Sequence, residues 1–362
     1  MTLQRRPKDL TGDFVLITIP TGNALGGYDL RLRPGKIPLE MLKKLVNRYR
    51  GVNDLRVIIG PNIGLDAGAI AFGRKALVAS SDPVTLAQEE IGWYAVHINA
   101  NDVAVMGARP RWFLADVLLP EGKANAEDIF KQVDRACREL SATVVGGHTE
   151  VTIGLDRPIV IGTMLGEVPK DRLLSSADAR VGDRIVLTKG IAIEGTAILA
   201  QEKGEELARA FGLKFVRRAR RYLYNPGISI VREAMIAARM GAHAMHDPTE
   251  GGLLGGLYEM MMASGVGVEL AEDDVPIFSE SKKAAAHFRL DIFRLIASGC
   301  LVVAASARIA RRLIKEYERQ GIAAAEVGRF TRRGFSVLRG GKRIFLPRGS
   351  IGEDEIVKVL GY

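Results

Sequence analysis

The sequence predicts an α/β (α+β) protein made of two halves of similar size. The chain has 362 residues, which is enough for two domains. Runs with helical periodicity alternate with short β-rich runs along both halves, so strands and helices are mixed rather than segregated. A polar connector at residues 168–183 separates the halves, and we place the domain boundary there.

The first half begins with an irregular lead-in at residues 1–35, which includes a β-like run at 14–19 and a glycine-rich loop at 21–27. Apolar residues at helical spacing then predict a helix from Pro38 to about Tyr49. The elements expected after this helix are strands at 56–59 and 77–81, a long helix at 85–106, a strand at 112–119, a helix at 124–140, and strands at 142–146 and 158–165. Together these elements form an expected first domain over residues 36–168.

The second half is expected to form a domain over residues 177–345, followed by a short tail at 346–362. Helical spacing predicts helices at 193–202, 228–239, 251–263 and 308–320. Short apolar runs predict strands at 184–188, 266–270, 301–304, 324–330 and 336–338.

Composition narrows the class of protein. No run of 18 apolar residues occurs, so no membrane span is expected, and no secretory signal is expected either. Cys137 and Cys300 cannot build a disulfide framework, which suits a reducing cytoplasm. The net charge of +9 comes partly from basic clusters at 217–221 and 308–315, which are either solvated helix faces or a surface for nucleic acid. Because only 6 % of residues are aromatic, a stacking platform for single strands is disfavoured.

The common nucleotide and metal motifs, such as the phosphate-binding loop and the paired histidines of metalloproteases, are absent from the sequence. Acidic side chains instead follow predicted strands and helices in the first half. Asp66 lies in a glycine-rich loop at 60–69, which is otherwise a simple turn. Asp82 follows a predicted strand, where it is either a site residue or an N-cap.

Asn99 and Asp102 are three residues apart and therefore share one face of the predicted long helix. A carboxylate such as Asp102 is costly to bury among apolar residues unless a cation or hydrogen-bond donors accompany it. Because oxygen ligands suit Mg²⁺, we predict that Asp66, Asp82 and Asp102 bind this metal.

Two further segments combine glycine with polar side chains. At residues 145–151 a predicted strand breaks at a glycine pair, and the next residue, His148, is either a ligand or a structural histidine. At 247–250 the sequence predicts a capped helix start, with Asp247 and Glu250 forming a capping box. Glycines at 251, 252, 255 and 256 then indicate close approach of a ligand or backbone, and the free N–H groups favour an anion. The alternative is a well-capped helix packed on a sheet.

Taken together, these segments resemble the PurM-like, or AIR synthase-related, superfamily, and within it the HypE hydrogenase-maturation branch. The similar stretches follow the family's order at 35–38, 60–70, 80–84, 101–110, 146–150, 247–252 and 264–268. The resemblance implies a two-domain architecture in which N-terminal sheets pair across a homodimer into a barrel, beside a C-terminal α/β sandwich. It also implies an ATP- and Mg²⁺-dependent activity in a cleft near the dimer interface.

The resemblance also implies roles for individual residues. The expected metal ligands are Asp66, Asp82 and Asp102. The expected nucleotide-binding residues are Asn99, Asp102, Gly146, Gly147, His148, Thr149, Asp247, Gly251 and Gly252.

This chain departs from the family pattern at several positions, and these departures bear on which reaction it catalyses. The HypE branch uses a C-terminal Cys to carry a carbamoyl group, and this chain has no Cys after Cys300. Leu65, His148 and Glu250 also replace residues that relatives often keep. The leading hypothesis is therefore a Mg-ATP-binding enzyme that transfers a phosphoryl group to an unknown small acceptor or hydrolyses ATP. The alternatives are a catalytically reduced nucleotide-binding scaffold or sensor dimer, and, less favoured, a nucleic-acid binder.

Overall fold

The computed structural model describes residue 37, residues 39–85, residue 87, and residues 89–122, 125–347 and 354–360. The β-like run predicted at 14–19 and the loop predicted at 21–27 lie outside the described residues. Among the described residues, no helix is long and apolar enough to cross a membrane.

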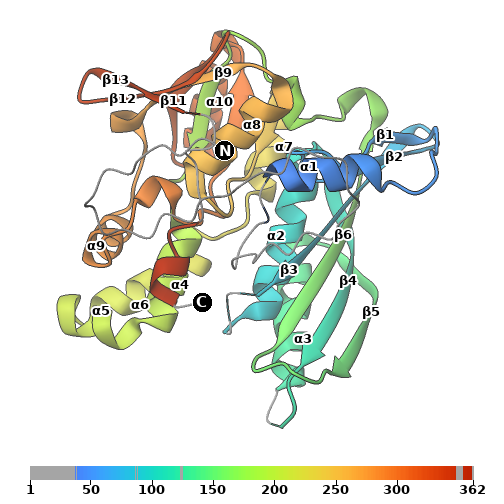
Figure 1. Cartoon of the computed structure of the whole chain (residues 1–362), viewed down its shortest axis with the longest axis vertical. Coiled ribbons are helices and arrows are strands. Elements are labelled where there is room, and N and C mark those ends of the chain that lie inside the picture. Colours follow the sequence, from blue (N-terminus) through green and yellow to red (C-terminus); the bar gives the residue numbers. More distant parts are fainter. Residues whose placement is uncertain are drawn as a thin grey trace, which may run out of the picture. The chain divides into compact units, whose positions relative to one another are not determined.

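The first half forms a six-stranded sheet in the order β1-β2-β3-β6-β4-β5 (Figure 1). Neighbouring strands are antiparallel except β4 and β5, which are parallel. The strands are β1 Val57–Ile59, β2 Gly68–Phe72, β3 Lys75–Val84, β4 Arg109–Leu119, β5 Thr143–Val151 and β6 Ile159–Pro169.

Helices α2 (Ile91–Val105) and α3 (Ala126–Leu140) pack on this sheet, and α1 (Leu39–Arg48) precedes it (Figure 1). α3 is amphipathic and buries Ile129, Val133 and Ala136 at helical spacing. α2 is buried along nearly its whole length, because it also contacts α7 and β8 of the second half. This central position explains why polar side chains on α2 lie in the interior.

The two faces of the first sheet differ. Along β6, alternate residues are fully or partly buried, as expected for a strand with one face on the core. Apolar side chains stay exposed elsewhere in the sheet, at Val57, Ile58, Ile70, Phe72, Trp112, Val144 and Val145. The whole of edge strand β5 is exposed. A single chain therefore leaves much of the apolar surface of this sheet uncovered.

The second half forms a seven-stranded sheet in the order β13-β12-β9-β11-β7-β10-β8. The strands are β7 Arg184–Thr188, β8 Ala244–His246, β9 Gly267–Ala271, β10 Val302–Ala305, β11 Ala324–Thr331, β12 Phe335–Arg339 and β13 Lys342–Leu346. All pairings are antiparallel except that of β9 with β12.

Helices cover both faces of this second sheet. Alternate residues of β7 enter two different apolar clusters: Ile185 and Leu187 join side chains of α8, whereas Val186 joins side chains of α7 and α10. The helices are α4 Ile193–Glu202, α5 Gly204–Phe211, α6 Leu213–Arg220, α7 Val231–Met240, α8 Gly252–Ser264, α9 Ser279–His287, α10 Ala307–Arg319 and α11 Val357–Leu360. Short 3₁₀ helices lie at Lys170–Arg172, Ser176–Asp178, Arg221–Leu223, Glu272–Asp274 and Ile292–Arg294.

The structure confirms the mixed α/β class with two sheets. It also corrects individual elements. The long helix begins at Ile91 rather than residue 85, because Glu90 has a φ of 59°, which a right-handed helix cannot include. Strands β2, β8 and β13 and helices α5, α6 and α9 were not predicted. The strands are short and α9 is weakly periodic, whereas α5 and α6 are amphipathic and their pattern was overlooked. The limits proposed for the two domains remain a prediction.

Candidate functional site

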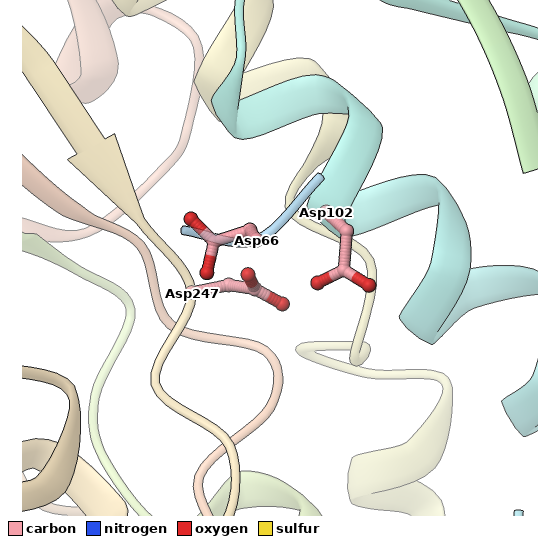
Figure 2. Close-up of side chains that lie close together, drawn as sticks. All are labelled: Asp66, Asp102 and Asp247. Carbon is pink, nitrogen blue, oxygen red and sulfur yellow. The ribbon is translucent and has the colours of Figure 1, made fainter. Parts of the chain in front are cut away.

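Three carboxylates from distant parts of the sequence converge in the structure. One oxygen each of Asp66, Asp102 and Asp247 lies within 4.8 Å of the other two (Figure 2). Asp66 belongs to the loop between β1 and β2, Asp102 to the buried helix α2, and Asp247 follows β8 directly. We call these residues the acid trio. The fold therefore brings elements of both halves to one point.

The members of the acid trio differ in their partners. Asp102 is 5 % exposed and accepts a hydrogen bond from the Ser80 hydroxyl at 2.6 Å. Asp247 is 2 % exposed, and neither of its carboxylate oxygens has a hydrogen-bond partner among the described residues. An unpaired buried carboxylate is costly. Asp247 is therefore the member of the trio that most needs a further ligand.

Electrostatics supports the same conclusion. Burial raises the pKa of Asp102 and of Asp247 well above the usual range, and the neighbouring carboxylates raise it further. Close carboxylates repel one another when ionised, and a divalent cation among them removes this repulsion. Their oxygen atoms are the ligands preferred by Mg²⁺ and Ca²⁺ rather than by softer metals. The residues of the acid trio thus fit a hard divalent cation.

Asp82 does not join the acid trio. It lies within strand β3 and is exposed, so the alternative interpretation as a helix N-cap is wrong. It lines a cavity of about 250 Å³ together with Asp66 and the loop at 60–62. A direct role for Asp82 in metal binding stays a prediction, and the structure places it beside the trio rather than in it.

Asn99 is fully buried, and its amide contacts the chain itself. Its Oδ1 accepts a hydrogen bond from the backbone N–H of Asp82 at 2.8 Å, and its Nδ2 donates to the carbonyl of Ala95 at 2.9 Å. Asn99 therefore ties strand β3 to helix α2 at Asp82. Nucleotide binding by this side chain remains a prediction, since its amide already serves this contact.

The predicted segment Gly146–Thr149 lies on edge strand β5. Its side chains are exposed, and His148 Nε2 lies 3.2 Å from Glu150 Oε2 on the same strand. Strands β6 and β4 separate β5 from β3, the strand whose Ser80 contacts Asp102, by roughly 14 Å at the usual strand spacing. Within one chain, this segment is therefore not brought to the acid trio.

The helix after Asp247 begins within one residue of the predicted start at 251, but without the predicted cap. α8 starts at Gly252, Gly251 is its N-cap, and no side chain of the expected capping box caps it. The capping-box prediction for Asp247 and Glu250 is therefore wrong. The Gly251 N–H instead donates a hydrogen bond to Asp354 Oδ2 at 2.7 Å. The anion at this helix end is thus a carboxylate of the chain itself, and a phosphate would have to displace it.

The sequence interpretation missed several residues around the trio. The Ser176 hydroxyl lies 3.0 Å from Asp66 Oδ2, and His246 Nδ1 lies 2.7 Å from Asp66 Oδ1. Glu259 on α8 lies 3.2 Å from the other ring nitrogen of His246. The adjacency of His246 to Asp247 was the one available signal. The contacts of Ser176 and Glu259 depend on tertiary packing and leave no local pattern.

Comparisons with known proteins match both halves of the chain. Residues 64–168 match the N-terminal domain of the AIR synthase related proteins, and residues 180–340 match their C-terminal domain. The carbamoyl dehydratase HypE of Azotobacter vinelandii is 32 % identical over 73 % of this chain and 76 % of that protein. A putative hydrogenase expression/formation protein of Methanocaldococcus jannaschii is 27 % identical over 78 % of this chain and 83 % of that protein.

A crystal structure of the hydrogenase maturation protein HypE in complex with ATP has a similar fold. Its TM-score is 0.64 at 22 % sequence identity, and the match covers 84 % of this chain and 89 % of that chain. At this level of identity the likeness concerns the fold.

Proposed function

We propose that this chain, which belongs to the AIR synthase-related protein family, binds Mg-ATP and either transfers a phosphoryl group to a small acceptor or hydrolyses ATP. The acid trio is the observation that carries this proposal, because it combines buried carboxylates with an unpartnered Asp247. The HypE structure with bound ATP supports the choice of nucleotide. The identity of the acceptor is open.

Asp66, Asp102 and Asp247 would hold the metal ion. A bound Mg²⁺ supplies positive charge that offsets the negative charge of nucleotide phosphates. The protein's own contribution is to fix these carboxylates on three different elements and to bury two of them, Asp102 and Asp247. Asp82 lines the neighbouring cavity, where an ATP phosphate and its metal could be accommodated.

We further propose that the protein forms a homodimer through its first sheet. Exposed apolar side chains on this sheet, such as Phe72, Trp112 and Val145, favour a protein partner over water. A second copy would also explain how residues 146–149 could contribute to a nucleotide site that they do not reach within their own chain. A closed interface of this kind would cover the exposed edge strand β5.

Light scattering on Phe72→Glu and Val145→Glu tests the dimer. Both substitutions are expected to give monomers, because each places a charge in the proposed interface. Phe130→Glu is the matched control, since Phe130 is an exposed aromatic residue on α3, outside the sheet. A wild-type monomer, or equal behaviour of all three variants, would contradict this interface.

Calorimetric titration of ATP with and without Mg²⁺ tests the nucleotide site. Asp247→Asn is expected to weaken Mg-ATP binding by about 100-fold or more, because an oxygen ligand and a negative charge are lost together. Asp82→Asn should have a smaller effect. Asp156→Asn serves as the control, since the Asp156 side chain is 92 % exposed and lies outside the acid trio.

Phosphate release measured on the same proteins distinguishes an enzyme from a nucleotide-binding scaffold. Mg-dependent binding with release of phosphate supports an enzyme. Binding without release across a broad set of acceptors supports the nucleotide-binding scaffold instead. Equal affinity of the wild type and Asp247→Asn would contradict the assignment of the metal site.

A further inference from the structure

His246 lies between two carboxylates that belong to different elements. Its Nδ1 is 2.7 Å from Asp66 Oδ1, and its Nε2 is 3.2 Å from Glu259 Oε2. The three side chains are 3 %, 8 % and 15 % exposed, in the order His246, Asp66, Glu259. Each ring nitrogen thus lies within ion-pair distance of a carboxylate, although neither contact has the alignment of a hydrogen bond among the described residues. A row of titratable side chains therefore runs from helix α8 through β8 to the acid trio.

Two glycines allow this row to form. A Cβ at Gly256 on α8 would lie 2.9 Å from His246 Cδ2. Gly64, with a φ of +73°, lets the loop of Asp66 approach α8 so closely that a Cβ there would lie 2.3 Å from the carbonyl oxygen of Glu259. The imidazole and the loop thus both rest directly on α8. The backbone of this helix sets the distance between Glu259 and Asp66.

Both oxygens of Asp66 have partners before any cation binds. Oδ1 faces His246, and Oδ2 lies 3.0 Å from the Ser176 hydroxyl. Asp247, by contrast, has neither a hydrogen bond nor an ion pair among the described residues, whereas Asp66 has the hydrogen bond from Ser176 and the ion-pair contact with His246. Asp66 is therefore held in one orientation, with its remaining lone pairs available to a ligand. Fixing a ligand in advance reduces the entropy lost on binding.

We propose that His246 and Glu259 are positioning residues that orient Asp66 as a metal ligand. This inference rests on the metal site of the proposed function. Glu259 holds the imidazole, the imidazole holds Asp66, and neither residue has to contact the metal. Loss of a group that orients a metal ligand typically weakens metal affinity by about 10- to 100-fold.

Titration of the nucleotide-free full chain with Mn²⁺, followed by electron paramagnetic resonance, tests this inference. Glu259→Ala is expected to weaken Mn²⁺ binding by about 10-fold. Glu259→Gln keeps an acceptor oxygen and should stay within about threefold of the wild type. Glu316→Ala is the matched control, because Glu316 is a helical glutamate that pairs with Arg319 outside this row. Melting temperatures are measured alongside.

A pair of histidine variants tests the direction of the contact. The amide nitrogen of His246→Asn occupies roughly the position of Nδ1 and faces Asp66, whereas that of His246→Gln lies nearer the position of Nε2. We therefore expect tighter Mn²⁺ binding by His246→Asn than by His246→Gln. A purely structural role would lower the melting temperatures without separating the two affinities. If Glu259→Ala does not fold, this pair decides the question.

The possible outcomes separate this inference from the proposed function. Wild-type binding that is lost in Asp247→Asn, but unchanged in Glu259→Ala and equal in the two His246 variants, overturns the positioning role and leaves the metal site standing. Absence of Mn²⁺ binding by the wild type overturns the metal site and the positioning role together. Graded loss, with Glu259→Gln close to the wild type, supports both.

Discussion

Folding of a single chain brings the members of the acid trio together but leaves the segment Gly146–Thr149 apart from them. The trio draws its members from a loop, a buried helix and the end of a strand, and the described structure leaves Asp247 without a partner. Gly146–Thr149 lies on one exposed edge strand, where His148 contacts its close neighbour Glu150. One chain thus assembles a candidate cation site by itself. The glycine segment could join such a site only across a surface that another molecule supplies.

The largest effect is expected where the loop of Asp66 rests on α8. Gly64→Ala combines a positive φ of +73° with a Cβ only 2.3 Å from the carbonyl oxygen of Glu259, so the loop must move away from the helix. We expect a loss of about 4 kcal/mol in the free energy of unfolding, measured by denaturant titration.

Gly73→Ala provides the matched control for Gly64→Ala. Gly73 also has a positive φ, +59°, but a Cβ there would have no atom within 4 Å. It should lose only about 1 kcal/mol from backbone strain. Equal losses in the two variants would show that close packing of the loop on α8 contributes nothing.

The second prediction concerns the charge of the acid trio. The pKa values of Asp102 and Asp247 are raised in the folded protein, so their contribution to stability is present at low pH and is lost as pH rises through the raised values. A bound divalent cation reverses this loss. At pH 8, Mg²⁺ at 100 times its dissociation constant should stabilise the wild type by about 2.7 kcal/mol.

The same stabilisation should be smaller at pH 5, because protons compete with Mg²⁺ for these carboxylates. Asp247→Asn should gain little from Mg²⁺ at either pH. Sodium chloride at equal ionic strength controls for screening of surface charges. A gain that is the same at both pH values, or that persists in Asp247→Asn, would place the cation elsewhere.

The third prediction addresses the edge strand. A Cβ at Gly147 would lie 2.0 Å from the carbonyl oxygen of Ala115, and the φ of Gly147 is +142°. Gly147→Ala is therefore expected to cost about 2 kcal/mol of unfolding free energy, less than Gly64→Ala because an exposed edge strand can shift. In Gly146→Ala the nearest atom would be 3.6 Å away, so unfolding experiments should show little change. Similar losses in both variants would contradict this account of the glycine pair.

Sequence patterns predicted the secondary-structure elements more accurately than they predicted the contacts between side chains. The helix near 193–202 and the strand at 184–188 agree with α4 and β7, because both are largely apolar runs that the fold buries. The cap predicted for α8 was wrong because Asp247 followed by Pro248 is a common capping pattern, whereas here Asp354, from the far end of the chain, accepts the Gly251 N–H. Chemistry singled out Asp66, Asp102 and Asp247, but only folding shows that they meet.

The same limit explains what was missed around the trio. Nothing in the sequence distinguishes Glu259 from other glutamates on helices. Its proximity to His246 depends on Gly64 and Gly256, which allow close packing. Asp82 and Asn99 were assigned ligand-binding roles, yet the backbone N–H of Asp82 donates to the side-chain Oδ1 of Asn99, a contact that joins β3 to α2. Tertiary packing, which no local pattern encodes, decides which polar groups remain free for a ligand.

The smallest effect is expected for His148→Ala. The His148 side chain is 65 % exposed, and its contact with Glu150 lies within one strand, so the melting temperature should change by only about 1 °C. Affinity for Mg²⁺ without nucleotide should also stay unchanged, because His148 is remote from the acid trio in its own chain. If a second copy brings β5 to the nucleotide, the same variant should weaken ATP binding while leaving the binding of metal alone intact. Weaker binding of the metal alone would show instead that the edge strand and the acid trio form one site, and the contrast between the two regions would not hold.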